Sequence, residues 1–337
     1  HREGSTMALN FAASIKQKKE EVPITNVQVE GVVVAKLIKH CKDCLPSFVT
    51  GQLLGLDIGS TLEITYSFPF PNKSDQDVAG SEDDDASYQL EMMRCLREVN
   101  VDNNTVGWYQ STYVGSYQTL ELVETFMSYQ ESIKRCVCIV YDPQAAAQGS
   151  FGLKVLKLKE KFFNLFKEGK VSATQLNQEG ITSKDIFQEL PITVTNSSLV
   201  AAMFSVLQRD SQADQGTFDR LHISEPDSLE KNLEFMMDSV DEYHSKVYQV
   251  SQYHRMSQRL EVQHQQWLQK RKAENASRRA AGDDPLSEED PNYTPLNEPS
   301  RMESFLISNQ TTNFSEKIAL AGGQTLQKLC VMDSLYK

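Results

Sequence analysis

Apolar residues follow two different periods along the chain. Up to about residue 208, short apolar runs alternate with segments of helical spacing, and turn-forming residues separate them. These runs predict strands at 27–31, 49–56, 61–68, 104–109, 135–141, 150–158 and 190–194, and helices at 32–41, 88–99, 119–130 and 197–208. Strands interleaved with helices of this length indicate an α/β domain, which we place at residues 24–209.

Beyond residue 228 the apolar residues recur in alternating steps of four and three. This spacing predicts a long amphipathic helix over 228–280 with a heptad seam. The seam cannot bury itself, and a second helix predicted over 301–333 can cover only part of it, so we expect other proteins to supply further helices. We call these residues the apolar seam: Leu229, Leu233, Met236, Val240, Tyr243, Val247 and Val250.

Polar segments connect these parts. We expect a flexible N-terminal extension over 1–23, in which 1–6 precede Met7 and resemble an appended sequence. A linker is predicted over 210–227, and a flexible, acidic, proline-rich loop over 281–300.

Two shorter features affect these predictions. The acidic stretch at 72–87 reads as an exposed loop, and the alternative of a carboxylate metal site has no other ligand to support it. Gly322 and Gly323 should weaken or break the last helix.

The most informative stretch is Val106–Thr112, a buried strand that ends abruptly in a loop. Gly107 lets another backbone approach closely, and Trp108 and Tyr109 bring large apolar surfaces. Residues that follow a strand end are held still by the strand, which is why α/β domains place their chemistry there. Gln110, Ser111 and Thr112 occupy that position.

This stretch, together with 47–55, 62–71 and 88–100, resembles the MPN family. In the active branch, a His-x-His-Pro run, a Ser and an Asp hold zinc for isopeptide hydrolysis, and a Glu is catalytic. Here Gln110 and Thr112 stand where the two histidines would be, Val123 where the Asp would be and Phe48 near the Glu. None of these side chains can replace a zinc ligand. The resemblance implies an MPN α/β/α sandwich with a mixed sheet, without catalytic residues, metal or cofactor.

The sequence at Leu62–Thr65, Phe68–Pro71, Tyr88–Arg94 and Gln148–Ser150 resembles the non-catalytic branch of the family that belongs to eukaryotic translation initiation factor three. The likeness runs from about residue 27 to 207 and returns weakly at 301–329. It implies a cytoplasmic structural subunit that supports assembly of the 43S preinitiation complex and recruitment of mRNA to the small ribosomal subunit.

The same resemblance implies the partners. They are the other subunits of the factor: a second MPN subunit, and PCI-type subunits whose helices would join the C-terminal helices in an inter-subunit bundle. Contact with the ribosome and mRNA would come mainly through the complex, with no membrane and no small-molecule substrate. Two alternatives stay open: a non-catalytic scaffold of the proteasome lid or the signalosome, and a zinc-dependent deubiquitinase with displaced ligands.

The predicted helix at 88–99 is apolar on two sides. One stripe contains Leu90, Met93 and Leu96, and the other contains Met92, Cys95 and Val99. One side belongs to the sheet, and the resemblance to paired MPN domains assigns Met92, Cys95 and Val99 to a partner domain. The alternative is burial of both sides within the domain.

Composition narrows the function further. A net charge of −12 and a pI near 5.1 argue against a dedicated nucleic-acid binder. The basic run at 270–272 reads as a charged helix end, with ribosomal RNA contact as the alternative. The six cysteines are expected to be reduced thiols. Cys41 and Cys44 form a CxxC beside His40, but a second ligand pair for zinc is missing.

Overall fold

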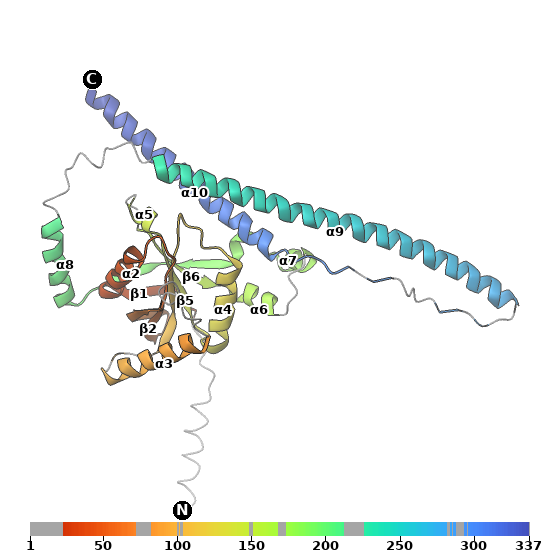
Figure 1. Cartoon of the computed structure of the whole chain (residues 1–337), viewed down its shortest axis with the longest axis horizontal. Helices are drawn as coiled ribbons and strands as arrows, with labels where there is room; N and C mark the ends of the chain where they lie inside the picture. Colours follow the sequence, from red (N-terminus) through yellow and green to blue (C-terminus); the bar gives the residue numbers. More distant parts are fainter. Residues whose placement is uncertain are drawn as a thin grey trace, which may run out of the picture.

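A computed structural model gives the fold (Figure 1). It describes residues 23–71, 82–99, 101, 104–147, 151–167, 173–211, 226–281 and 296–336, and residues 284, 286, 287, 293 and 294. The strands are β1 (Asn26–Glu30), β2 (Thr50–Ile58), β3 (Thr61–Pro69), β4 (Thr105–Ser111), β5 (Val137–Tyr141), β6 (Leu153–Leu158), β7 (Phe187–Leu190) and β8 (Ile192–Thr195). The helices are α2 (Gly31–Asp43), α3 (Glu82–Glu98), α4 (Leu120–Ser132), α5 (Pro143–Ala147), α6 (Glu160–Lys167), α7 (Ala173–Glu179), the 3-10 helix η2 (Ser183–Asp185), α8 (Ser198–Ser211), α9 (Pro226–Ala281) and α10 (Met302–Tyr336).

The strands form one sheet in the order β7-β6-β5-β4-β2-β3-β1-β8. β4 runs parallel to β5 and antiparallel to β2, so the sheet is mixed, as predicted. β4 lies in the interior of this sheet, which confirms the buried strand expected at its position. Its carboxyl end, at Ser111, opens into the loop that leads to α4.

The prediction of a single strand at 190–194 is wrong, because the structure has two strands in this region. The structure divides this region into β7 and β8, which lie at opposite edges of the sheet although only Pro191 separates them. Proline has no N–H to donate, and its carbonyl accepts a hydrogen bond from the Val27 N–H at 3.0 Å. The two edges of the sheet therefore meet at Pro191, and the sheet is strongly curled.

Apolar side chains pack on both faces of the sheet. On one face, Tyr109 and its neighbours pack against α2, with Val33 and Leu37 buried. On the other face, Trp108 packs against α4, where Phe126 is buried, and the start of α10 joins the same core through Leu306. β4 is thus fixed from both sides, which holds its carboxyl end in place.

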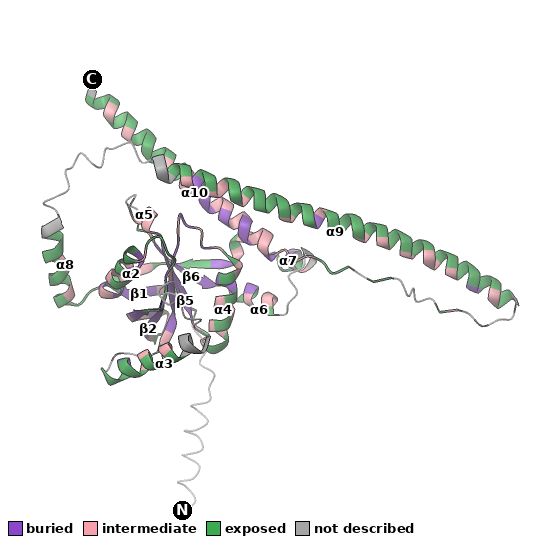
Figure 2. Cartoon of the chain, in the orientation of Figure 1, coloured by how far each residue is buried: buried purple, intermediate pink, exposed green. Residues whose placement is uncertain are grey.

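The two C-terminal helices dominate the shape of the molecule. α9 has 56 residues, which corresponds to a length of about 84 Å at 1.5 Å per residue. It crosses over the globular part beside α10 and extends far beyond it (Figure 1), and most of its surface is exposed (Figure 2). Phe314 of α10 is buried and stacks on Phe235 of α9, with ring centroids 6.2 Å apart.

Two further sequence predictions are corrected. Glu82–Asp85 begin α3 instead of lying in a loop, because carboxylates favour the positive end of the helix dipole; the preceding residues 72–81 lie outside the described part. α10 continues through Gly322 and Gly323 without a break. A helical glycine costs only about 1 kcal/mol, which the flanking turns can offset.

Candidate functional site

Gly107 sets the position of the β4 end. Its φ is +152°, and a Cβ there would lie 1.8 Å from the carbonyl oxygen of Val137 on β5. Any other residue would therefore push β4 away from β5. At the end of the strand, the Ser111 Oγ accepts a hydrogen bond from the Val49 N–H at 2.9 Å, and the Thr112 N–H donates to the Tyr141 carbonyl at 2.8 Å.

The four positions that the resemblance aligns with zinc and catalytic residues of the active branch differ in exposure. Gln110 is half-buried and Thr112 is buried, while Val123 is fully buried within the core and Phe48 is 64% exposed. The Thr112 Oγ1 is buried, and no hydrogen-bond partner for it lies among the described residues. Within the described ranges, no three His, Cys, Asp or Glu side chains come together as a metal site would require.

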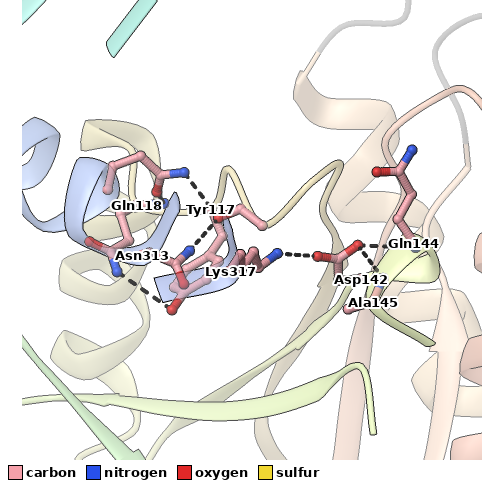
Figure 3. Close-up of polar contacts among 9 residues, drawn as sticks. Tyr117, Gln118, Asp142, Gln144, Ala145, Asn313 and Lys317 are labelled. Atoms are coloured by element: carbon pink, nitrogen blue, oxygen red, sulfur yellow. Dashed lines mark hydrogen bonds and ion pairs between the residues drawn. The ribbon is translucent and has the colours of Figure 1, made fainter. Parts of the chain in front are cut away.

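Asp142 supplies a carboxylate at this end of the sheet, directly after β5. Its Oδ1 accepts hydrogen bonds from the N–H groups of Gln144 and Ala145, at 3.1 and 3.2 Å. Its Oδ2 pairs with the Lys317 Nζ of α10 at 2.6 Å (Figure 3). The carboxylate thus caps α5 and anchors α10, and both of its oxygens are engaged.

α10 also holds the loop between β4 and α4. The side-chain amides of Gln310 and Asn313 both donate to the Gly115 carbonyl, at 3.0 and 2.9 Å, and the Gln118 N–H donates to the Gln310 Oε1 at 3.3 Å. Val114 in this loop has a φ of +57°, a region that β-branched residues rarely adopt. The contacts from α10 hold this strained loop conformation in place.

The loop and α10 enclose a cavity of about 650 Å³. Apolar side chains such as Val114 and Leu153 line it, together with the Lys317–Asp142 and Lys154–Glu189 ion pairs. Two ion pairs thus lie in the wall of the cavity, and the carboxylate residue Glu316 lines it as well.

His40 and Cys41 lie on α2, behind β4. The His40 Nδ1 is 2.9 Å from the Tyr109 hydroxyl, and burial lowers the pKa of His40, which keeps the imidazole neutral at pH 7. Burial also raises the pKa of the Cys41 thiol to about 12. A thiol that stays protonated is a poor metal ligand and a poor nucleophile, which supports the structural reading of the CxxC.

The apolar seam of α9 is divided between the interior of the chain and solvent. Val250 is 8% exposed and Met236 is half-buried. The other five members are between 37% and 46% exposed: Leu229, Leu233, Val240, Tyr243 and Val247. The fold of this chain therefore covers only one edge of the seam.

In the second half of α9, polar and aromatic side chains contact the segment that follows the helix, and sequence reasoning missed these contacts. Tyr253 donates to the Leu296 carbonyl at 3.4 Å, His264 stacks on Tyr293 at 4.1 Å, and the Asn275 side chain exchanges two hydrogen bonds with Leu286. Tyr253, His264 and Asn275 are spaced by eleven residues, which is three helical turns, and that repeat was the available signal. They hold the described residues of the segment after α9 against the helix.

The residues in and directly after α3 that we expected to bind a partner domain also differ in exposure. Cys95 and Val99 are exposed, while Met92 packs beside the small core around Leu96. Leu90, which we grouped with the residues that face the sheet, is 73% exposed. The stripe containing Met92, Cys95 and Val99 thus does not form one outward face.

Sequence comparison identifies the class of protein. A family model described as JAB1/Mov34/MPN/PAD-1 ubiquitin protease matches residues 23–135, the part that contains β4 and its loop. The globular part therefore has an MPN domain, with a mixed sheet between helices and with long helices following it.

A second family model, described as the C-terminal region of eIF3h, matches residues 146–337. The H subunit of eukaryotic translation initiation factor 3 from Arabidopsis thaliana is 50% identical over 336 residues, covering 98% of this chain and 99% of the relative. The protein of the same name from Dictyostelium discoideum is 40% identical, covering 92% of this chain and 94% of the relative. The chain belongs to the family of H subunits of eukaryotic translation initiation factor 3. Among the described residues, no helix is long and apolar enough to cross a membrane.

Proposed function

We propose that this chain is a non-catalytic structural subunit of the translation initiation factor 3 complex, and that partner helices bind the apolar seam of α9. The exposure of the seam is the observation that carries the proposal. Leu233, Val240 and Val247 are each at least 40% exposed on a helix that extends beyond the globular part. Apolar surface of this kind, repeated at heptad spacing, favours association with further helices.

The non-catalytic part of the proposal rests on the β4 end. An amide at Gln110, a hydroxyl at Thr112 and a buried Val123 cannot supply the three ligands of a catalytic zinc. The nearby carboxylate, Asp142, is already bound by Lys317. The family name and the side chains at the β4 end both favour a role in assembly.

The partners proposed for the two surfaces are different. PCI-type subunits would supply helices to the seam, and a second MPN subunit would bind the exposed side of α3 at Cys95 and Val99. Through these contacts the chain would support the 43S preinitiation complex in the cytoplasm. The ribosomal subunit and mRNA would be reached mainly through the complex.

Deletion of residues 229–337 would not test the seam alone. It would also remove Leu306 of α10 from the core of the globular part and could unfold it. A pair of exposed seam residues offers a better test. We expect Leu233→Asp combined with Val240→Asp to lower recovery of the factor 3 subunits with the tagged chain by at least about tenfold, since two charges would be desolvated at the interface.

The control is Ile58→Asp, at the last residue of β2, which is apolar and 53% exposed. Both variants should keep the Tm of the isolated chain. Full recovery of the partner subunits with the seam variant would show that the seam does not hold the complex together.

A further inference from the structure

The second half of α9 extends beyond the globular part, and one side of it contacts the segment that follows the helix (Figure 1). Tyr253, His264 and Asn275 mark that side. Arg255 follows Tyr253 by two residues, which is a rotation of about 200° around the helix axis. The exposed Arg255 side chain is therefore directed away from the contacted side and toward solvent.

Two more cations share this outward surface. Arg259 follows Arg255 by about one turn, and Lys270 follows Arg259 by about three turns, so the three side chains lie along one side of the helix. We call Arg255, Arg259 and Lys270 the basic face. All three are exposed, and no ion pair within the described part of the chain includes them. Glu261, the one carboxylate between residues 243 and 273, follows Arg259 by two residues and lies on another side of the helix.

The helix dipole does not explain the two arginines of the basic face. The dipole favours cations in the last turn of a helix, which accounts for Arg278 and Arg279. Arg255 and Arg259 lie about six turns or more before the end of α9 at Ala281. Like charges one turn apart repel each other, and no ion pair among the described residues relieves this repulsion. A bound anion would relieve it.

We propose that the basic face binds the phosphate backbone of double-stranded RNA. Arginine, lysine and glutamine side chains are among the groups that contact phosphate and sugar oxygens. Among the described residues that line the shallow groove around Arg255 and Arg259, Val262 is apolar and the others are glutamines. A protein partner would instead be expected to cover an apolar centre. The chemistry of this groove therefore favours a nucleic-acid backbone.

Single-stranded RNA fits the basic face less well. Proteins that bind single strands combine cations with aromatic side chains on which the bases stack. Between Arg255 and Lys270 the aromatic residues are His264 and Trp267, whose rings stack on each other with centroids 6.5 Å apart. His264 also stacks on Tyr293 at 4.1 Å. A row of cations without free stacking surfaces suits double-stranded RNA, which is recognised by its shape and its phosphates.

The acidity of the whole chain does not prevent this contact. The net charge is −12, but the carboxylates of the first half of α9 end at Glu242. Glu242 lies about 20 Å before Arg255 along the helix, at 1.5 Å per residue. The Debye length is about 10 Å in 0.1 M salt, so these carboxylates are largely screened from an RNA at the basic face.

A fluorescently labelled RNA duplex of about 20 base pairs tests the inference against the full chain. Fluorescence anisotropy should detect binding at low salt, and log Kd should rise with log salt concentration with a slope of about 2–3, as three phosphate contacts require. Arg255→Gln with Arg259→Gln should raise Kd at least about fivefold and lower this slope by about two. Absence of binding at low salt would overturn the inference.

A matched double variant shows whether the position of the charges matters. Lys39→Gln with Lys42→Gln removes the same charge from two exposed positions of α2 and should leave both the Kd and the slope unchanged. Both double variants should keep the Tm of the parent chain, since glutamine is a good helix former. An equal rise of Kd in the two double variants would overturn the inference, because binding would then depend on net charge alone.

Two competitors distinguish double-stranded RNA from other anions. Single-stranded RNA of the same length and poly-glutamate should each displace the labelled duplex at least about fivefold less effectively per charge than unlabelled duplex. Equal displacement by the single strand would contradict the choice of a duplex. Equal displacement by poly-glutamate would overturn the RNA assignment and give the basic face to an acidic protein segment.

Discussion

The end of β4 and the first half of α9 differ in how their surfaces are used. At the end of β4, polar groups are bound within the chain: Lys317 pairs with Asp142, and Asn313 donates to Gly115. On the first half of α9, apolar side chains such as Leu233 and Val240 are exposed. The region that the resemblance aligns with the zinc site of the active branch is partly covered by α10, and the apolar seam of α9 is exposed to solvent.

This difference indicates what each surface can do. At the end of β4, the Lys317 and Asp142 charges neutralise each other, so this ion pair has little free energy left for a ligand or a transition state. An exposed apolar seam gains free energy when it is covered, at roughly 25 cal/mol for each Å² of apolar area. The contrast supports action through assembly, and the following substitutions test its two sides.

The largest effect is expected for Phe314→Ala. Phe314 is 1% exposed and stacks on Phe235, so its removal should cost about 3–4 kcal/mol of unfolding free energy. Tyr243→Ala, on the exposed seam, should cost less than about 0.5 kcal/mol. Urea denaturation measures both. Similar losses of unfolding free energy in the two variants would contradict the distinction between a buried contact at Phe314 and an exposed surface at Tyr243.

Lys317→Met should have the next largest effect, about 2 kcal/mol, because it leaves the largely buried Asp142 carboxylate without its cation. Adding Asp142→Asn should restore part of the loss, and the double-mutant cycle gives the coupling. Independent, additive effects would mean that the ion pair does not hold α10 on the globular part.

A smaller effect, on the stability of the helix, is expected at the end of α10 beyond the globular part. Gly322→Ala and Gly323→Ala should each stabilise the helix by about 1 kcal/mol, which slows amide exchange in the following turns about fivefold. Apart from the adjoining residues and the backbone of α10 itself, no atom of the described residues lies within 4 Å of the added Cβ at either position. Ala319→Gly is the matched change in the opposite direction and should speed exchange there. Unchanged exchange in all three variants would show that glycine does not limit this helix.

The smallest effect is a pH dependence at Asp185. Hydrogen bonds from Lys159 and Thr182 hold the pKa of this carboxyl well below its usual range. A lowered folded-state pKa stabilises the fold above the unfolded-state value of about 3.9; the contribution declines below that value and is lost as the pH falls through the folded-state pKa. The difference in urea midpoint between Asp185→Asn and the parent should therefore be largest at pH 7 and become smaller as the pH is lowered to 3. A constant difference across this range would contradict the assignment.

Much of the α/β part could be predicted from local pattern. β4 was recognisable from Val106–Thr112, because Gly107 allows a neighbouring backbone to approach closely and Trp108 and Tyr109 bring large apolar surfaces, as suits a buried strand. The division at Pro191 was not recognisable, since periodicity reports strand character and not which edge a strand joins. The helical start at Glu82–Asp85 was missed because acidic composition alone predicts loop and helix start equally.

The candidate site was predictable only in part. The apolar seam followed from its heptad spacing, although nothing in that spacing showed that Val250 would be covered and Val240 exposed. The contacts of Gln310, Asn313 and Lys317 were not predictable, because polar residues on a helix give no sign of which distant loop they meet. Long-range contacts of this kind depend on the tertiary fold.

Side-chain footprinting with hydroxyl radicals tests the central claim most directly. The isolated chain and the purified translation initiation factor 3 complex that contains it would be labelled in parallel. The account predicts that labelling of Leu233, Tyr243 and the adjacent Met237 falls several-fold in the complex, while labelling of the exposed Ile58 stays constant. Equal labelling of these three residues in both samples would contradict the claim that the chain acts through the apolar seam of α9.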